Sequence, residues 1–81
     1  MVNITLNEVE VTYLLKQRPE TKKNGGFQEL FVILQERFDY STSTLTLDND
    51  LTERIVRYKG NYGTGGYQSR LRKIFGRTLL A

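Results

Sequence analysis

The sequence predicts an α+β domain, mainly α, in which two pseudo-symmetric strand–helix–turn–helix repeats form a four-helix domain with a short two-stranded antiparallel pair. Three observations lead to this expectation: an internal repeat, a short alternating segment that opens each copy, and a helical apolar stripe that closes each copy. With 81 residues, the chain has room for a single domain, residues 1–81.

The internal repeat is anchored by the peptide Gly-Gly-Phe-Gln at 25–28, which recurs as Gly-Gly-Tyr-Gln at 65–68. With Lys23 looped out, residues 4–39 align with residues 45–79 over 35 positions, and six aligned pairs are identical. These pairs are Thr5/Thr46, Leu6/Leu47, Gly25/Gly65, Gly26/Gly66, Gln28/Gln68 and Arg37/Arg77. A collinear set with one gap is hard to obtain by chance, so we interpret it as a duplication.

Each repeat opens on a short β-branched segment with alternating character, Ile4 to Leu6 or Leu45 to Leu47. Such segments are typical of brief strands. We expect the two strands to pair antiparallel near the pseudo-twofold axis, which closes their inner edges. If these segments only lead into helices, the domain is all-α instead. Residues 39–44 form the predicted linker between the repeats.

The first helix of each repeat is predicted over about 8–18 and about 50–59. Its capping residues are Asn7 with Glu10 in the first repeat, and Asp48 or Asp50, with Glu53, in the second. Pro19 and Gly60 are expected to end these two helices. Polar, glycine-rich loops follow at 19–26 and 60–66.

The second helix of each repeat carries an apolar stripe at helical spacing. The stripe residues are Phe27, Leu30, Phe31, Leu34 and Phe38 in the first repeat, and Tyr67, Leu71, Ile74, Phe75 and Leu79 in the second. We interpret both stripes as core, because no polar anchor for a cofactor lies among them. The second of these helices is expected from about 66 to 79.

Positive charge is concentrated in the second repeat. Residues 1–40 carry five cationic side chains against six carboxylates, whereas residues 41–81 carry seven against three. On the last predicted helix, Arg70, Lys73 and Arg77 follow i, i+3, i+7 spacing and therefore share one face. Features present in both copies are expected to serve architecture, and features of one copy are candidates for function.

The basic face favours a small nucleic-acid-binding module, with DNA and RNA both possible. Arginine, lysine, tyrosine, glutamine and serine side chains near a helix start provide phosphate contacts, with stacking and base-edge contacts in addition. The predicted contact residues are Arg57, Lys59, Tyr62, Gln68, Ser69, Arg70, Arg72, Lys73 and Arg77. The alternative interpretation is a solvated basic face that keeps the protein in solution and binds no partner. The shared Gly-Gly turn is interpreted as a helix entry rather than as a phosphate-binding loop.

Composition argues against most enzyme chemistry. The chain has no cysteine and no histidine, so the usual zinc ligands, the commonest general base and the Ser-His and Cys-His nucleophile pairs are missing. We therefore expect no catalytic residues, no metal and no cofactor. No stretch is long and apolar enough for a membrane span, and the first residues do not resemble a secretory signal. The expected location is the cytoplasm.

A second hypothesis comes from the first repeat, whose later helix has more apolar residues than one face can hide. Either Val32 or Ile33 should be partly exposed in a monomer. This predicts a possible homodimer through the helix from Phe27 to Phe38. The alternative function is accordingly a protein–protein adaptor or inhibitor that acts on another macromolecule.

Overall fold

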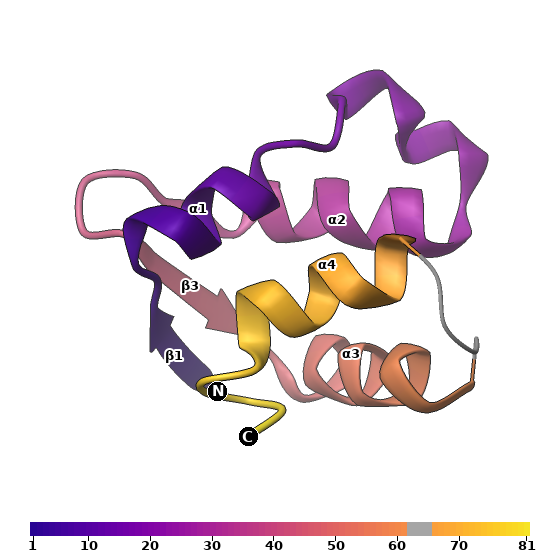
Figure 1. Cartoon of the computed structure of the whole chain (residues 1–81). Coiled ribbons are helices and arrows are strands. Elements are labelled where there is room, and N and C mark those ends of the chain that lie inside the picture. Colours follow the sequence, from indigo (N-terminus) through magenta and orange to yellow (C-terminus); the bar gives the residue numbers. More distant parts are fainter. Residues whose placement is uncertain (62–65) are drawn as a thin grey trace.

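The computed structural model describes residues 1–61 and 66–81, with side chains described up to residue 59 and from residue 66. The elements follow the order β1 (Val2–Thr5), α1 (Glu8–Leu14), the 3-10 helix η1 (Pro19–Asn24), α2 (Gly26–Glu36), β2 (Phe38–Asp39), β3 (Thr44–Leu47), α3 (Asn49–Asn61) and α4 (Gly66–Phe75). The domain is α+β and mainly helical, as the sequence predicts (Figure 1).

The sheet is antiparallel, in the order β1–β3–β2. The predicted pairing of the two opening segments is confirmed, with Ile4 opposite Leu45. The third strand is additional: β2 consists of Phe38, which the sequence predicts on the helical stripe, and Asp39 from the start of the predicted linker, and it pairs Phe38 with Leu45. Its return to β3 is tight because the Asp39 carboxylate accepts hydrogen bonds from the N–H and hydroxyl of Ser41.

Helix α1 ends at Leu14, four residues before the predicted end at residue 18. The Gln35 side chain of α2 explains the early end, because its Nε2 donates to the carbonyls of Leu14 and Gln17 at 2.9 and 2.7 Å. The Gln35 amide thus satisfies carbonyl groups that would otherwise accept from the N–H groups of a longer helix. The start is as predicted, with Asn7 and Glu10 forming a reciprocal capping box.

The other helix boundaries also differ in detail from the expectations. The predicted loop 19–26 contains η1, and α3 covers Asn49–Asn61 rather than 50–59. Of the two capping candidates for α3, it is Asp48 that accepts the N–H of Leu51, at 2.8 Å. Helix α4 ends at Phe75 rather than near 79.

Helix α4 stops at Phe75, just before Gly76, whose N–H still donates to the Arg72 carbonyl at 2.6 Å in the helical i to i−4 pattern. A Cβ at this position would lie 2.5 Å from that oxygen, so the close approach requires glycine. The chain then turns, and the N–H of Leu80 donates to the carbonyl of Phe75. Leu79 and Leu80 pack against the core from this turn, not from a helix.

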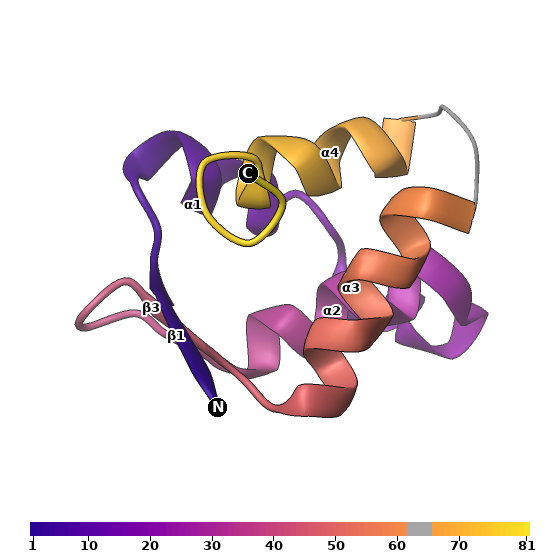
Figure 2. The same ribbon diagram turned by 90° about the horizontal axis from the view of Figure 1, so that it is seen from below.

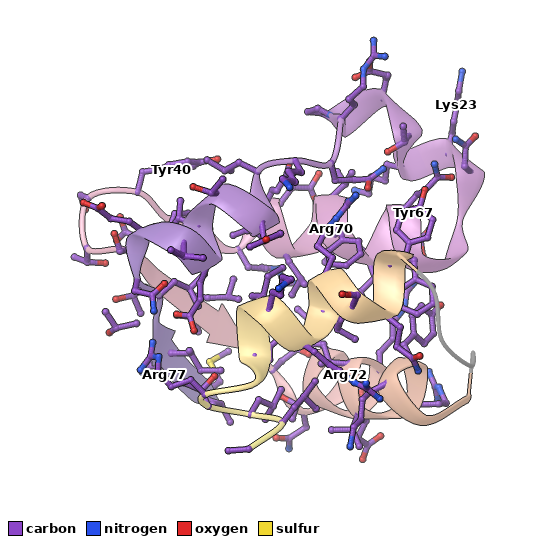
Figure 3. All side chains as sticks on the ribbon, viewed as in Figure 1. Lys23, Tyr40, Tyr67, Arg70, Arg72 and Arg77 are labelled. Atoms are coloured by element: carbon purple, nitrogen blue, oxygen red, sulfur yellow. The ribbon has the colours of Figure 1, made fainter. Side chains whose placement is uncertain are left out.

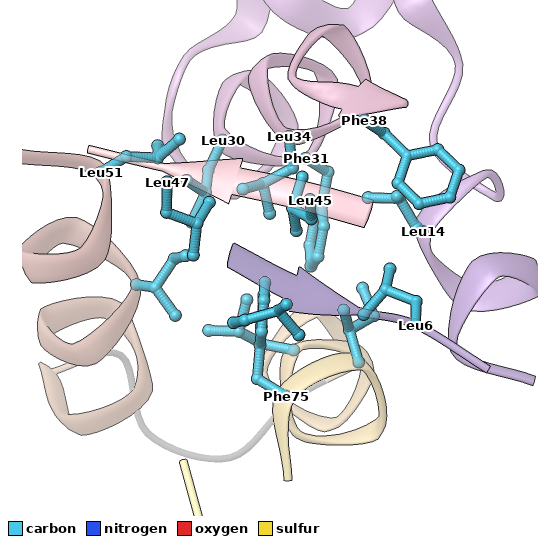
Figure 4. Close-up of a cluster of buried hydrophobic side chains, with 14 of the residues drawn as sticks. Leu6, Leu14, Leu30, Phe31, Leu34, Phe38, Leu45, Leu47, Leu51 and Phe75 are labelled. Carbon is cyan, nitrogen blue, oxygen red and sulfur yellow. The ribbon is translucent and has the colours of Figure 1, made fainter. Parts of the chain in front are cut away.

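The core lies between the sheet and the helices, and both predicted stripes contribute to it (Figure 4). Its fully buried large side chains are Phe31, Phe75, Leu14, Leu30, Leu34, Leu45, Leu47, Ile55, Leu71 and Ile74. Three stripe residues remain partly accessible: Phe27 and Leu79 are half-buried, and Tyr67 is exposed at the start of α4. Within the described residues, no helix is long and apolar enough to cross a bilayer.

The α-helices lie on two sides of the molecule. In the view of Figure 2, α1 and α4 lie on one side of the molecule and α2 and α3 on the other. Helix α4 packs against α1 and also against α3, and it runs antiparallel to α1 (Figure 1). This arrangement sets the surroundings of the basic residues predicted to bind a partner.

Candidate nucleic-acid interface

The predicted basic face of α4 packs along α1. Each cation meets a residue of α1 or of the turn after it, one helical turn apart. Arg70 Nη1 donates to Gln17 Oε1 at 2.7 Å, Lys73 Nζ lies 5.4 Å from the centre of the Tyr13 ring, and Arg77 Nη2 lies 2.8 Å from Glu10 Oε1. We call these three contacts the polar ladder. The i, i+3, i+7 spacing thus serves the packing of two antiparallel helices, and the face is not displayed outward as a whole.

Arg77 has a structural position at one end of the ladder. Its Nη2 also donates to the Thr5 carbonyl of β1, so one guanidinium joins the turn after α4 to α1 and to the sheet. Its partner Glu10 is only 4% exposed. A buried carboxylate needs such a partner, because burying an unpaired charge is costly. Arg77 is therefore tied to the fold rather than free for a ligand.

The protonation of this pair reflects its contacts. Burial on its own raises the pKa of Glu10, but the hydrogen bonds from Arg77 and from the N–H of Asn7, with the guanidinium charge, outweigh burial. The pKa of Glu10 therefore lies below its ordinary value. The same hydrogen bond from Arg77 to Glu10 raises the pKa of the guanidinium. Both groups are held in their charged forms.

Arg70 lies at the opposite end of the ladder, beside aromatic rings. Its guanidinium carbon is 5.2 Å from the centre of the Phe31 ring and 5.4 Å from that of Tyr67. Tyr67 stacks on Phe27 with 5.7 Å between ring centres. Arg70 is half-buried, whereas Tyr67 retains 37% of its surface exposed. A cation and a partly accessible ring thus lie together at the start of α4 (Figure 3).

The remaining predicted contact residues fall into different surroundings. Gln68 is buried, and its Nε2 donates to the Lys59 carbonyl, so it fastens α4 to the end of α3. Ser69 is exposed, as are the side chains of Arg57, Lys59 and Arg72. Figure 3 shows Arg72 and Arg70 on opposite sides of α4. Tyr62 lies outside the described residues.

Ion pairing divides the cations of the chain into two groups. Of the 12 lysine and arginine side chains, five lie within 4.0 Å of a carboxylate: Arg18, Lys22, Arg37, Arg54 and Arg77. All nine Asp and Glu residues fall within the described ranges. The other seven cations form no ion pair there: Lys16, Lys23, Arg57, Lys59, Arg70, Arg72 and Lys73. Five of the six cations predicted as contacts belong to this second group.

Three of these cations gather with two aromatic rings along the meeting line of α1 and α4. Lys16 Nζ lies 4.4 Å from the centre of the Tyr13 ring, which Lys73 approaches from α4. Arg70 is the next residue of the polar ladder, and it reaches Tyr67. We call Tyr13, Lys16, Tyr67, Arg70 and Lys73 the basic strip.

No direct signal in the sequence marks the first two members of the strip. Tyr13 and Lys16 come from the less basic half, and a comparison of half charges does not select them. Only the antiparallel docking of α1 on α4 brings them beside Lys73. The available signal was their spacing of three residues near the end of a predicted helix, which places them on one side of it.

The second helix pair forms a different site. A groove of about 190 Å³ lies between α2 and α3, lined by Ile33, Arg37, Asp48, Asp50, Leu51 and Arg54. The groove lies beside two ion pairs, Arg37–Asp48 at 3.3 Å and Arg54–Glu29 at 2.6 Å. The predicted apolar excess of α2 is largely covered: Val32 is 3% exposed, and Ile33 is half-buried in the groove.

In the part of the chain that the structure describes, no cluster of acidic side chains could hold a metal ion. The chain matches no protein-family model, no curated protein and no solved structure. Its function is therefore argued from its own residues.

Proposed function

We propose that this chain is a non-enzymatic nucleic-acid-binding module that contacts the phosphate backbone through the basic strip. One observation carries the proposal. Lys16 from the turn after α1 and Arg70 and Lys73 from α4 gather without a carboxylate partner among the described residues, while the other cation on the same face of α4, Arg77, is neutralised by Glu10. Cations that the fold leaves uncompensated attract phosphate groups.

The chemistry of the strip suits this role. Lysine ammonium groups act as compact point charges on phosphate, and the guanidinium of Arg70 offers several donors, of which one is used by Gln17. Arg57 and Lys59 on α3 and Arg72 on α4 extend the positive field without forming ion pairs among the described residues. They steer a polyanion toward the strip.

The direct test is fluorescence anisotropy with labelled oligonucleotides of about 12 nucleotides, single-stranded and duplex, at about 50 mM salt. The double variant Lys16→Glu/Lys73→Glu should lose binding at least about tenfold. The comparison variant is Arg57→Glu/Lys59→Glu, which changes the net charge equally on α3 and should lose less, because these residues only steer the polyanion. Equal losses in both variants would mean that net charge alone matters, and wild-type protein that binds none of the probes would refute the function.

Salt dependence provides a second measurement on the same samples. Neutralising a single-strand phosphate contributes about −0.7 to the slope of log K against log salt. Three contacts therefore predict a slope near −2 and an affinity loss of about 20-fold between about 50 and 200 mM salt. A flat response would contradict phosphate contacts.

Arg77 has to be left out of such tests. Replacing it with glutamate places a second carboxylate beside buried Glu10, so loss of binding would report loss of the fold. Lys16 and Lys73 are exposed and form no ion pair within the described residues, which makes them clean positions for charge reversal.

A protein-binding role is the second candidate, and the groove between α2 and α3 favours it. Its lining combines Ile33 and Leu51 with charged groups of both signs, as at the rim of a protein interface. A homodimer through this side is one form of it. Ile33→Lys should then lower the mass measured by sedimentation from two chains to one at micromolar concentration. A wild-type mass of one chain would remove the homodimer.

We also propose that the two halves arose by duplication. The register of β1 and β3 supports this, because Ile4 lies opposite Leu45, its own aligned residue, and the flanking pairs exchange under a twofold rotation about that point. The aligned pair Arg37 and Arg77 supports it too. Each arginine forms an ion pair with a carboxylate at the start of the other half's first helix, Asp48 and Glu10.

A further inference from the structure

We infer that the basic strip takes single-stranded nucleic acid in preference to a duplex. This inference rests on the proposed function and names its substrate class. Three features of the strip carry it: the packing of α4, the accessible rings and the close grouping of the cations.

The packing of α4 argues against major-groove docking. A recognition helix enters the groove with its polar face free to contact bases and phosphates. Here that face of α4 lies along α1, where Arg70 is bonded to Gln17 and Arg77 to Glu10. Helix α4 therefore cannot enter a groove by this face without breaking the polar ladder.

The rings provide stacking surfaces for unpaired bases, which a single strand exposes and a duplex hides. Unstacked bases bind by stacking on aromatic side chains and on arginine planes. Tyr67 and Arg70 lie next to each other at the start of α4, with Tyr67 37% exposed. Tyr13 is half-buried between the two lysines of the strip. A base at either ring has a cation beside it for its phosphate.

The grouping of the cations fits one strand. Lys16 and Lys73 both lie within 5.4 Å of the centre of a single ring. The phosphates that flank a duplex major groove are separated by a gap about 12 Å wide, and contacts to both rows require cations spread over that width. Two ammonium groups at one ring match a single phosphate row.

The test compares a single strand of about 12 nucleotides with the duplex formed from it and its complement, at equal salt. Wild-type protein should bind the single strand about tenfold more tightly, as expected from one or two stacked bases. The variant Tyr67→Leu should lose about tenfold for the single strand and little for the duplex. Tyr67→Phe, which keeps a ring, should restore wild-type affinity.

The matched control is Tyr40→Leu, because Tyr40 is a tyrosine 63% exposed on the turn after β2, away from α4 (Figure 3). This variant should bind as the wild type does. Equal affinity for both forms, or equal losses in the two leucine variants, would overturn the single-strand inference and leave the function standing. Absence of binding to every probe would refute the function itself. Circular dichroism of each variant separates lost binding from lost folding.

Discussion

Under the proposed duplication, the contact between α1 and α4 corresponds to the contact between α3 and α2, yet the first is closed and the second is open. Between α1 and α4, the polar ladder fills the line of contact. Between α2 and α3, the corresponding line is a groove. In the alignment, Glu10 corresponds to Leu51 and Lys73 to Ile33. The closed pair thus has polar partners on both helices, and the open pair has leucine and isoleucine at those two places.

The contacts of Arg54 show why the line between α2 and α3 stays open. Arg54 aligns with Tyr13, and the partner of Tyr13, Lys73, aligns with Ile33. Ile33 therefore occupies the position where Arg54 would find its partner, and its side chain offers no acceptor. Its guanidinium bonds instead to Glu29, one turn earlier on α2, and to the Gly26 carbonyl. Desolvation on its own lowers the pKa of Arg54, but hydrogen bonds to Glu29 and Tyr58 outweigh it and raise that pKa. The comparison teaches that a contact between two helices is closed by matched polar partners rather than by similarity of the helices. We call the lines of contact between α1 and α4 and between α2 and α3 the two seams.

The largest expected effect comes from reversing the aligned arginines. Arg77→Glu should abolish cooperative thermal unfolding, because it places two carboxylates together where Glu10 is buried. Arg37→Glu should lower Tm by about 5 °C or less, since the Arg37–Asp48 pair is half-exposed and 3.3 Å long. Thermal melts followed by circular dichroism measure both. Similar shifts would contradict the distinction between the two seams.

The next effect is one of volume, tested by placing the same side chain in each seam. Ile74→Phe should destabilise the domain by about 1–3 kcal/mol, because Ile74 is fully buried on α4. Ile33→Phe should stabilise it by up to about 1 kcal/mol, because the larger ring covers apolar surface in the groove. Urea unfolding measures both. A destabilising Ile33→Phe would show that the groove has no room to fill.

The pH dependence of stability tests the buried carboxylate of the closed seam. The pKa of Glu10 in the folded protein lies below its ordinary value of 4.5, so the unfolded chain binds more protons. Its stabilising contribution is complete above about pH 4.5 and is lost as the pH falls through the folded-state pKa. Asp39, whose pKa is lowered chiefly by hydrogen bonds from Ser41, acts in the same direction.

Tm measured from pH 6 down to about pH 3 should therefore fall less steeply for Glu10→Gln than for the wild type. Glu53→Gln is the matched control, because Glu53 is exposed on α3 and forms no ion pair among the described residues. An unchanged slope in Glu10→Gln would show that the Arg77 contact contributes nothing to folding.

The smallest expected effect comes from the middle contact of the polar ladder, between Lys73 and Tyr13. Lys73→Met removes the charge beside Tyr13 but keeps the side-chain stem, so unfolding free energy should change by about 0.5 kcal/mol or less. Oligonucleotide affinity should fall in the same variant. A large loss of stability would place Lys73 with Arg77, as a structural residue rather than a contact.

Local patterns in the sequence predicted the elements well. The alternating segments formed β1 and β3, the stripes formed the core, and Asn7 with Glu10 formed the predicted capping box. Boundaries failed where a distant residue decides them. Helix α1 ends early because of Gln35, 21 positions after Leu14, and no local signal contains that contact.

The basic site was only partly predictable for the same reason. Charge counting selected Arg70 and Lys73, which the strip retains, and also Arg77, and the place of Gln68 in the first turn of the last helix selected that residue; Arg77 and Gln68 bind other parts of the fold. Nothing in the spacing of Arg77 distinguishes it from its neighbours. Only the docking of α1 on α4 separates these residues, and that docking depends on contacts between residues 53 to 67 positions apart.

Such distant contacts have a thermodynamic consequence. The seven-residue α1 is too short to persist in isolation, so Tyr13 and Lys16 lie beside Lys73 only while the domain is folded. A ligand held by Lys16 and Lys73 contacts the turn after α1 and helix α4 together, so it binds the native state in preference to the unfolded chain. Saturating it at a hundred times its Kd adds about 2.7 kcal/mol to global stability. A thermal-shift screen of polyanions therefore detects ligands of this surface without any knowledge of their sequence.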